Sequence, residues 1–252
     1  MTSASAISIA AASGEPAEAF AHVREWVFDL DNTLYCASVR LFDQIDARMT
    51  EYLTRLFRVD PVTARRIQKD YFHRYGTTLR GLILNREIAD PEDFLSYVHD
   101  IDYSHIAPNP ELDAALARIE GRKWVFTNGS KSHAEAVLER LGVRAHIDEI
   151  FDVTDARYAP KPLPEAFDAF FARTGIQPKH AAMFEDIARN LQEPHARGMV
   201  TVLVDHPANT DARCMCAHAD ERDGAHIHFR TDNLTDFLKR ITTAGKQHRD
   251  VL

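Results

Sequence analysis

The chain has 252 residues, of which 45% are hydrophobic and 27% are charged, and its formal net charge at pH 7 is −8. This composition is sufficient for a folded core, and the acidic balance argues against a nucleic-acid polymer as partner. No apolar run is long enough to cross a bilayer, so we expect no membrane partner either.

The N-terminal segment, residues 1–22, consists mainly of small side chains and has no Lys or Arg, unlike a signal or transit peptide. We expect it to be a disordered tail. The chain has three cysteines, Cys36, Cys214 and Cys216, and this odd number argues against a disulfide framework. Together these features predict a cytoplasmic protein.

Residues 26–28 are apolar and predict a short buried strand that ends at two carboxylates, Asp29 and Asp31. Side chains two positions apart in an extended chain point to the same side, so the two acids should lie close together. Two carboxylates this close repel each other, and a divalent cation or a shared proton relieves the repulsion.

The segment 38–107 has a helical pattern throughout. Apolar side chains at helical spacing predict helices over residues 45–56, 61–75, 79–88 and 91–98. Two of these helices begin with an Asp-Pro pair, which is typical of an N-cap followed by a first-turn proline. Since no strand interrupts them, the helices predict a small separate bundle.

From residue 108 onward, apolar stretches alternate with helical ones. Strands are expected over residues 123–127, 150–153, 181–184 and 199–204, helices over 110–119, 132–141, 163–174 and 187–197, and an edge strand and closing helix over 226–229 and 234–241. This alternation predicts an α/β fold with a Rossmann-like parallel sheet core and helices on both faces. The core would comprise residues 23–37 and 108–252, with the helical segment inserted between them.

The carboxyl ends of parallel strands lie side by side, so the residues after each strand are candidates for one shared site. These residues are Asp29 and Asp31 after the first strand, Thr127, Asn128 and Gly129 after the second, Lys161 after the third, and Glu185 and Asp186 after the fourth. The second group leads into a helix N-terminus, which suits an anion.

The stretches FDLDNTLY, FTNG, the lysine of PKP and FEDIARN resemble, in order and spacing, the four motifs of the haloacid dehalogenase superfamily of phosphohydrolases. The resemblance covers nearly the whole chain beyond the tail. It implies that the inserted helices, residues 38–107, form the helical cap of that superfamily. DNTLY and YGTTLRGL are similar to its pyrimidine 5'-nucleotidase branch.

The resemblance implies a Mg²⁺-dependent hydrolase of phosphoric monoesters that acts on a small-molecule ester, such as the pyrimidine nucleotides UMP and CMP. Asp29 would be the nucleophile that forms an aspartyl-phosphate, and Asp31 the general acid and then base. Thr127 and Lys161 would offset charge on the transferring phosphoryl group.

The resemblance also implies a metal site and substrate contacts. The Asp29 carboxylate, the Asp31 backbone carbonyl and Asp186 would hold Mg²⁺, with Glu185 beside them. Glu185 stands where the superfamily frequently has aspartate, so which of the two adjacent acids binds the metal directly stays open. Substrate would contact Asn128 and Gly129 in the core and Tyr75 and Arg80 in the cap.

Several alternatives remain open. The same motifs would suit a phosphatase for another ester such as a sugar phosphate, a phosphomutase, or a binding protein without activity. A dehalogenase would need neither Asp31 nor Asp186, so both acids argue against one. Arg80 would serve equally well in a structural ion pair.

The C-terminal residues Cys214, Cys216, His218, His226 and His228 suggest a zinc site. Two cysteines separated by a single residue depart from the usual C-x₂-C pattern. We therefore favour a polar loop that carries unpaired thiols.

Overall fold

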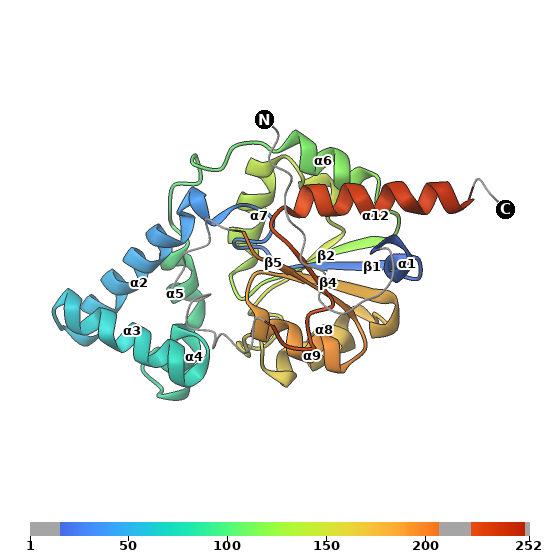
Figure 1. Cartoon of the computed structure of the whole chain (residues 1–252). Coiled ribbons are helices and arrows are strands. Elements are labelled where there is room, and N and C mark those ends of the chain that lie inside the picture. Colours follow the sequence, from blue (N-terminus) through green and yellow to red (C-terminus); the bar gives the residue numbers. More distant parts are fainter. Residues whose placement is uncertain (1–15, 207–222, 250–252) are drawn as a thin grey trace.

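The structure, a computed structural model, describes residues 16–206 and 223–249 (Figure 1). It contains a six-stranded, fully parallel sheet in the order β3-β2-β1-β4-β5-β6. The strands are β1 (Glu25–Phe28), β2 (Arg122–Phe126), β3 (Glu149–Phe151), β4 (Ala181–Glu185), β5 (Val200–Val204) and β6 (Phe229–Thr231). The predicted α/β fold is confirmed, and β1 lies inside the sheet between β2 and β4.

Helices cover both faces of the sheet, which explains why its strands are almost continuously apolar. One face packs against α6 (Pro110–Ala117), α7 (Lys131–Leu141) and α12 (Leu234–Arg249), and the other against α8 (Pro164–Thr174), the short 3₁₀ helix η4 (Ala188–Leu191) and α9 (Gln192–Ala196) (Figure 1). Val27 and Phe28 in β1 are fully buried, one on each face. The strand that carries Asp29 is therefore held rigidly by both halves of the core.

The inserted helices form a layer beside the sheet. They are α2 (Leu41–Phe57), α3 (Pro61–Tyr75), α4 (Thr78–Leu84) and α5 (Pro91–Val98) (Figure 1). They share a hydrophobic cluster of their own, which Val153 joins from the loop after β3. The predicted helix N-caps are confirmed at Asp60, whose carboxylate accepts hydrogen bonds from two backbone N–H groups, and at Asp90.

The exact limits of the inserted helical cap domain, at residues 38 and 107, stay a prediction.

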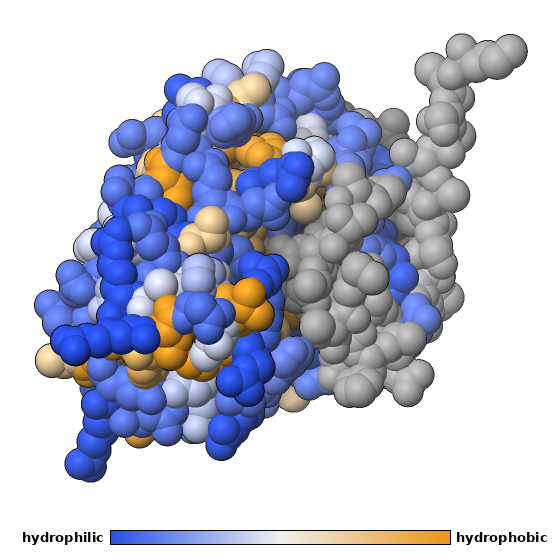
Figure 2. All heavy atoms as spheres, turned by 90° about the vertical axis from the view of Figure 1, so that its left-hand side faces the viewer, coloured by the Kyte–Doolittle hydropathy of each residue, from blue (hydrophilic) through white to orange (hydrophobic). Residues whose placement is uncertain are grey.

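The outer surface of this helical layer is mostly hydrophilic, with separate hydrophobic spots (Figure 2). Among the described residues, the large hydrophobic side chains that are exposed are Val62 and Leu84. The apolar faces of these helices therefore point mainly inward, toward one another and toward the sheet.

Part of the expected N-terminal tail is ordered. Residues Pro16–Phe20 form the short helix α1, and Phe20 is only 4% exposed. Its ring lies 5.8 Å from that of Trp26 and 5.7 Å from that of Phe237. The expectation of disorder is therefore wrong for this stretch, because burying a phenylalanine against the core stabilises it. Residues 1–15 lie outside the described part of the chain.

The last strand begins later than expected, at Phe229 and not at residue 226. The hydroxyl of Thr201 donates to the carbonyl of His226 and accepts from the backbone N–H of His228. A side chain thus replaces the strand ladder over these residues. Cys214, Cys216 and His218 lie outside the described residues, so the choice between zinc site and polar loop stays a prediction. No helix in the described ranges is long and apolar enough to cross a membrane.

Candidate active site

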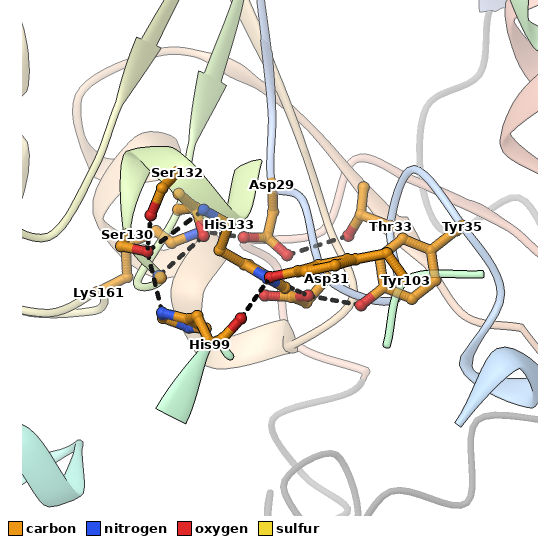
Figure 3. A network of polar contacts seen from close by, with 12 residues as sticks. Asp29, Asp31, Thr33, Tyr35, His99, Tyr103, Ser130, Ser132, His133 and Lys161 are labelled. Carbon is orange, nitrogen blue, oxygen red and sulfur yellow. Dashed lines mark hydrogen bonds and ion pairs between the residues drawn. The ribbon is translucent and has the colours of Figure 1, made fainter. Parts of the chain in front are cut away.

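The side chains predicted from the four loops meet at the carboxyl edge of the sheet. Figure 3 shows Asp29 and Asp31 from the first loop and Lys161 from the third. Lys161 Nζ donates to Asp29 Oδ1 and to Glu185 Oε2, at 2.7 Å each, and to the Phe126 carbonyl at 2.8 Å. Lys161 and Glu185 are 3% and 1% exposed. The lysine of the third loop therefore joins the first and fourth loops, as the sheet topology requires.

Asp29, Glu185 and Asp186 form a buried acidic cluster, in which each offers a carboxylate oxygen within 4.8 Å of the others. Burial, followed by the charge of Glu185, raises the pKa of Asp29 to about 7. Burial and the charge of Asp186 raise the pKa of Glu185 to about 7 as well. Burial would lower the pKa of Lys161, but the charges of Asp29 and Glu185 outweigh it and raise this pKa.

One ammonium group therefore faces three carboxylates. Excess negative charge, an oxygen-only donor set and burial are what a hard divalent cation such as Mg²⁺ favours. The residues present therefore fit the metal that the sequence predicts.

Two side chains contact one carboxylate oxygen of Asp31. Its Oδ1 accepts a hydrogen bond from Tyr35 OH at 2.5 Å and lies 2.9 Å from His133 Nε2 (Figure 3). His133 has no exposed surface. The sequence interpretation missed both partners, although His133 follows β2 at the same sheet edge as Thr127 and Tyr35 stands four residues after Asp31.

A second histidine connects the helical layer to this group. His99 is the C-cap of α5, and its Nδ1 lies 2.9 Å from Ser130 Oγ. Its ring stacks on that of His133, with the ring centroids 4.5 Å apart and the planes at 17°. Burial, followed by the charge of His133, lowers the pKa of His99 to about 3. The cap therefore reaches the second motif through a neutral imidazole.

The contact predicted between Asn128 and substrate stays a prediction, and the structure adds a second role for this residue. Its side-chain amide hydrogen-bonds the backbone N–H and carbonyl of Lys161, so it holds the lysine loop. A Cβ at Gly129 would lie 3.2 Å from His133 Cδ2 and 3.3 Å from Thr127 Oγ1, so a larger residue would require these side chains to move by a few tenths of an ångström. Thr127 Oγ1 also accepts a hydrogen bond from Gly129 N–H.

A pocket of about 130 Å³ lies between the core and the helices. Its core side includes Asp31, Asn128, Lys161 and Arg189. Its cap side is mainly apolar, formed by Phe42, Ile45, Met49, Phe72, Leu79, Phe94, Leu95 and Val98. A polar group completes it, in which Asp46 accepts from Gln68 Nε2 at 2.7 Å and pairs with Lys69 at 3.5 Å.

Two predicted cap contacts do not line this pocket. Tyr75 packs edge-on against Tyr71, with ring centroids 5.6 Å apart, and Arg80 is also absent from the lining. The preceding residues Thr77 and Thr78 line it instead, with Thr77 as the N-cap of α4. The sequence predicted that this segment contributes to the pocket, but it did not predict which of its side chains face the pocket. The start of α4 decides which positions point inward.

Comparison with known proteins agrees with this arrangement. The family model of haloacid dehalogenase-like hydrolases matches residues 26–193. The chain is 26% identical over 193 residues to Phosphate metabolism protein 8 of Saccharomyces cerevisiae (strain ATCC 204508 / S288c), a match that covers 70% of this chain. It spans 60% of the length of that relative.

Two solved structures show the same fold. The crystal structure of 2-haloacid dehalogenase from Pseudomonas syringae pv. Tomato DC3000 has a TM-score of 0.55 and 17% identity, and covers 88% of this chain and 99% of that one. The crystal structure of a HAD phosphatase from Thermococcus onnurineus has a TM-score of 0.50 and 19% identity. This match covers 75% of this chain and 89% of that one. At these identities the likeness concerns the fold alone.

Proposed function

The chain belongs to the haloacid dehalogenase-like hydrolase family, whose model matches two thirds of it, and on this premise we propose that it is a Mg²⁺-dependent phosphomonoester hydrolase. The observation that carries the proposal is Lys161, which binds Asp29 and Glu185 beside a third carboxylate, that of Asp186. In the proposal these residues supply a nucleophile, a fixed cation and a metal-binding acid cluster within one buried site. The name of the yeast relative, Phosphate metabolism protein 8, refers to phosphate metabolism and supports the same proposal.

The proposed reaction has two transfers. Asp29 attacks phosphorus, the ester P–O bond breaks, and Asp31 gives its proton to the leaving oxygen. Water then attacks the aspartyl-phosphate, Asp31 takes a proton from that water, and the bond from phosphorus to Asp29 breaks to release phosphate. Lys161 fixes Asp29 Oδ1 throughout and, with Thr127 and the Gly129 turn, offsets phosphoryl charge.

Mg²⁺, held by Asp29, Asp186 and the Asp31 backbone carbonyl, would supply further neutralisation of the phosphoryl oxygens. We assign direct metal binding to Asp186 in preference to Glu185. Both oxygens of Glu185 have partners in the protein, since Oε2 accepts from Lys161 Nζ and Oε1 from the Ile187 N–H at 3.1 Å. Glu185 would then act by holding Lys161.

The presence of Asp31 in the pocket favours a phosphatase over a dehalogenase, the activity named for one structural relative. A dehalogenase needs no proton for a halide leaving group, whereas an alkoxide leaving group does need one. Asp31 lines the pocket and is held by Tyr35 and His133, as a proton donor to a leaving group should be.

For the substrate we propose a pyrimidine nucleoside 5'-monophosphate. The pocket offers apolar walls for a flat ring and a polar group of Asp46, Gln68 and Lys69 for its carbonyl and amide edge. A cytoplasmic location, inferred from composition, is part of the same proposal.

The test is phosphate release from a panel of nucleotides, sugar phosphates and 4-nitrophenyl phosphate, with Mg²⁺ and with EDTA. Asp29→Asn should reduce turnover more than about 1,000-fold, and Asp168→Asn, a surface control that pairs with Arg197, should not change it. Absence of phosphate release by the wild type on the whole panel would overturn the proposal. Conversion of one phosphate ester into an isomer, without free phosphate, would identify a phosphomutase.

A further inference from the structure

His133 is a fully buried histidine whose two ring nitrogens both have polar partners in the site (Figure 3). Nε2 lies 2.9 Å from Asp31 Oδ1, and Nδ1 lies 3.0 Å from Tyr103 OH. The single hydroxyl hydrogen of Tyr103 goes to the His99 carbonyl at 2.9 Å. Tyr103 then accepts from His133 Nδ1–H, so Nε2 accepts a hydrogen from the protonated Asp31 carboxyl when the ring is neutral and donates to Oδ1 only when the ring is an imidazolium.

The stacking contact further fixes this ring. The His99 ring lies parallel to that of His133, and the backbone N–H of His133 donates to the N-cap Ser130 at 3.3 Å. Ser130 Oγ is also within 2.9 Å of His99 Nδ1. The ring is thus held in its plane by hydrogen bonds and from one side by a second imidazole, an arrangement that leaves it one orientation.

The position of Asp31 depends on this ring. Tyr35 OH and His133 Nε2 meet the same oxygen, Oδ1, from two different elements, the turn after β1 and the first turn of α7. Partners from two different elements on one carboxylate oxygen restrict rotation about the Cβ–Cγ bond more than either partner alone would. General acid catalysis requires a proton donor held within hydrogen-bond reach of the leaving oxygen.

We infer that His133 is a positioning residue that, together with Tyr35, orients the Asp31 carboxylate for proton transfer to the leaving group. The inference rests on the proposed phosphatase function and extends it to a residue outside the four motifs. Because His99 from α5 stacks on the same ring, the orientation of Asp31 also depends on the helical layer that forms the other wall of the pocket.

The experiment compares two leaving groups by kcat/KM, which reports the first transfer. UMP, or another alkyl phosphate that the wild type hydrolyses, needs its leaving oxygen protonated, whereas 4-nitrophenolate leaves without a proton. His133→Phe keeps a flat ring against His99 and removes both nitrogens. It should lower kcat/KM about 100-fold for the alkyl ester and less than tenfold for 4-nitrophenyl phosphate. His133→Gln, whose side-chain amide can again hydrogen-bond Oδ1, should recover part of the loss.

A double-mutant cycle separates positioning from general damage. In an Asp31→Asn background, His133→Phe should leave the ratio of the two kcat/KM values unchanged, because the group it orients is already absent. His146→Phe is the matched control, since His146 Nε2 contacts Asp113 Oδ1 at 2.7 Å and neither residue lines the pocket. It should leave the ratio at the wild-type value.

The inference is overturned if His133→Phe lowers kcat/KM equally for both substrates, or lowers it for neither. If this variant does not fold, as judged by circular dichroism, Tyr35→Phe replaces it, because it removes the other partner of Oδ1 and should shift the ratio in the same direction. An unchanged ratio in Tyr35→Phe would then count against the inference. A wild type that releases no phosphate from any ester overturns the proposed function itself, a result distinct from equal losses in the variants.

Discussion

The side chain of Asn128 makes two hydrogen bonds to the backbone of Lys161. Its oxygen accepts from the Lys161 N–H at 2.8 Å, and its nitrogen donates to the Lys161 carbonyl at 3.2 Å. The two residues follow different strands, β2 and β3, and are 33 positions apart in the chain. A single amide therefore sets the backbone from which Lys161 reaches Asp29.

Asn128→Ala should release the lysine loop. Loss of the two hydrogen bonds is expected to lower the free energy of unfolding by about 1–3 kcal/mol and phosphate turnover at least tenfold. Thermal unfolding and phosphate release measure the two effects. Asn85→Ala is the control, because Asn85 Nδ2 also donates to a backbone carbonyl, that of Gly81 at 2.9 Å, but outside the pocket. Normal turnover in folded Asn128→Ala would contradict this role.

Metal binding should depend more on Asp186 than on Glu185. Addition of Mg²⁺ at about 100 times its Kd is expected to stabilise the wild type by about 2.7 kcal/mol in thermal unfolding, without any substrate present. Asp186→Asn should abolish this stabilisation, because it removes a direct ligand. Glu185→Gln should retain most of it while weakening the contact with Lys161. The opposite pattern in the two variants would reverse our assignment.

The His99 pKa predicts a pH dependence of stability. Its folded-state pKa of about 3 lies below the ordinary value of 6.5, so the unfolded chain binds more protons between these values. The stabilising effect of neutral His99 is therefore present above pH 6.5 and lost as the pH falls.

Between pH 7 and pH 5 the wild type should lose at most about 2 kcal/mol relative to His99→Asn, and less to the extent that water screens the ring. Urea unfolding at both pH values measures this difference. His73→Asn, at an exposed histidine, is the control and should lose as much unfolding free energy between the two pH values as the wild type. If His99→Asn lost as much unfolding free energy as the wild type between pH 7 and pH 5, burial would not keep His99 neutral.

Substrate choice should depend on Lys69, which lines the pocket, and not on Arg80, which does not. Lys69→Met removes a cation from the polar group and is expected to lower kcat/KM for UMP about tenfold, with little effect on 4-nitrophenyl phosphate. Arg80→Ala should change kcat/KM for UMP and for 4-nitrophenyl phosphate by the same factor. A selective loss of UMP turnover in Arg80→Ala would restore Arg80 as the residue that recognises the base or sugar.

The sequence by itself determined the sheet, the insertion and the chemical groups of the site. Alternating apolar and helical stretches predicted the parallel core, and Asp29, Lys161 and Asp186 were found as residues that follow strands. This succeeds because the carboxyl ends of parallel strands meet at one edge whatever the details of packing. The Asp-Pro and Gly signals located helix ends for similarly local reasons.

The tertiary structure alone decided how these groups act on one another. The contacts of Asp31 with His133 and of Asn128 with Lys161 join residues 102 and 33 positions apart. Arg80 does not line the pocket, because the start of α4 sets which side chains face it. The burial of Phe20 was missed because it needs α12, the last helix described. Local sequence fixes the chemistry that a segment can offer, whereas partners, burial and pKa depend on elements brought together only by the fold.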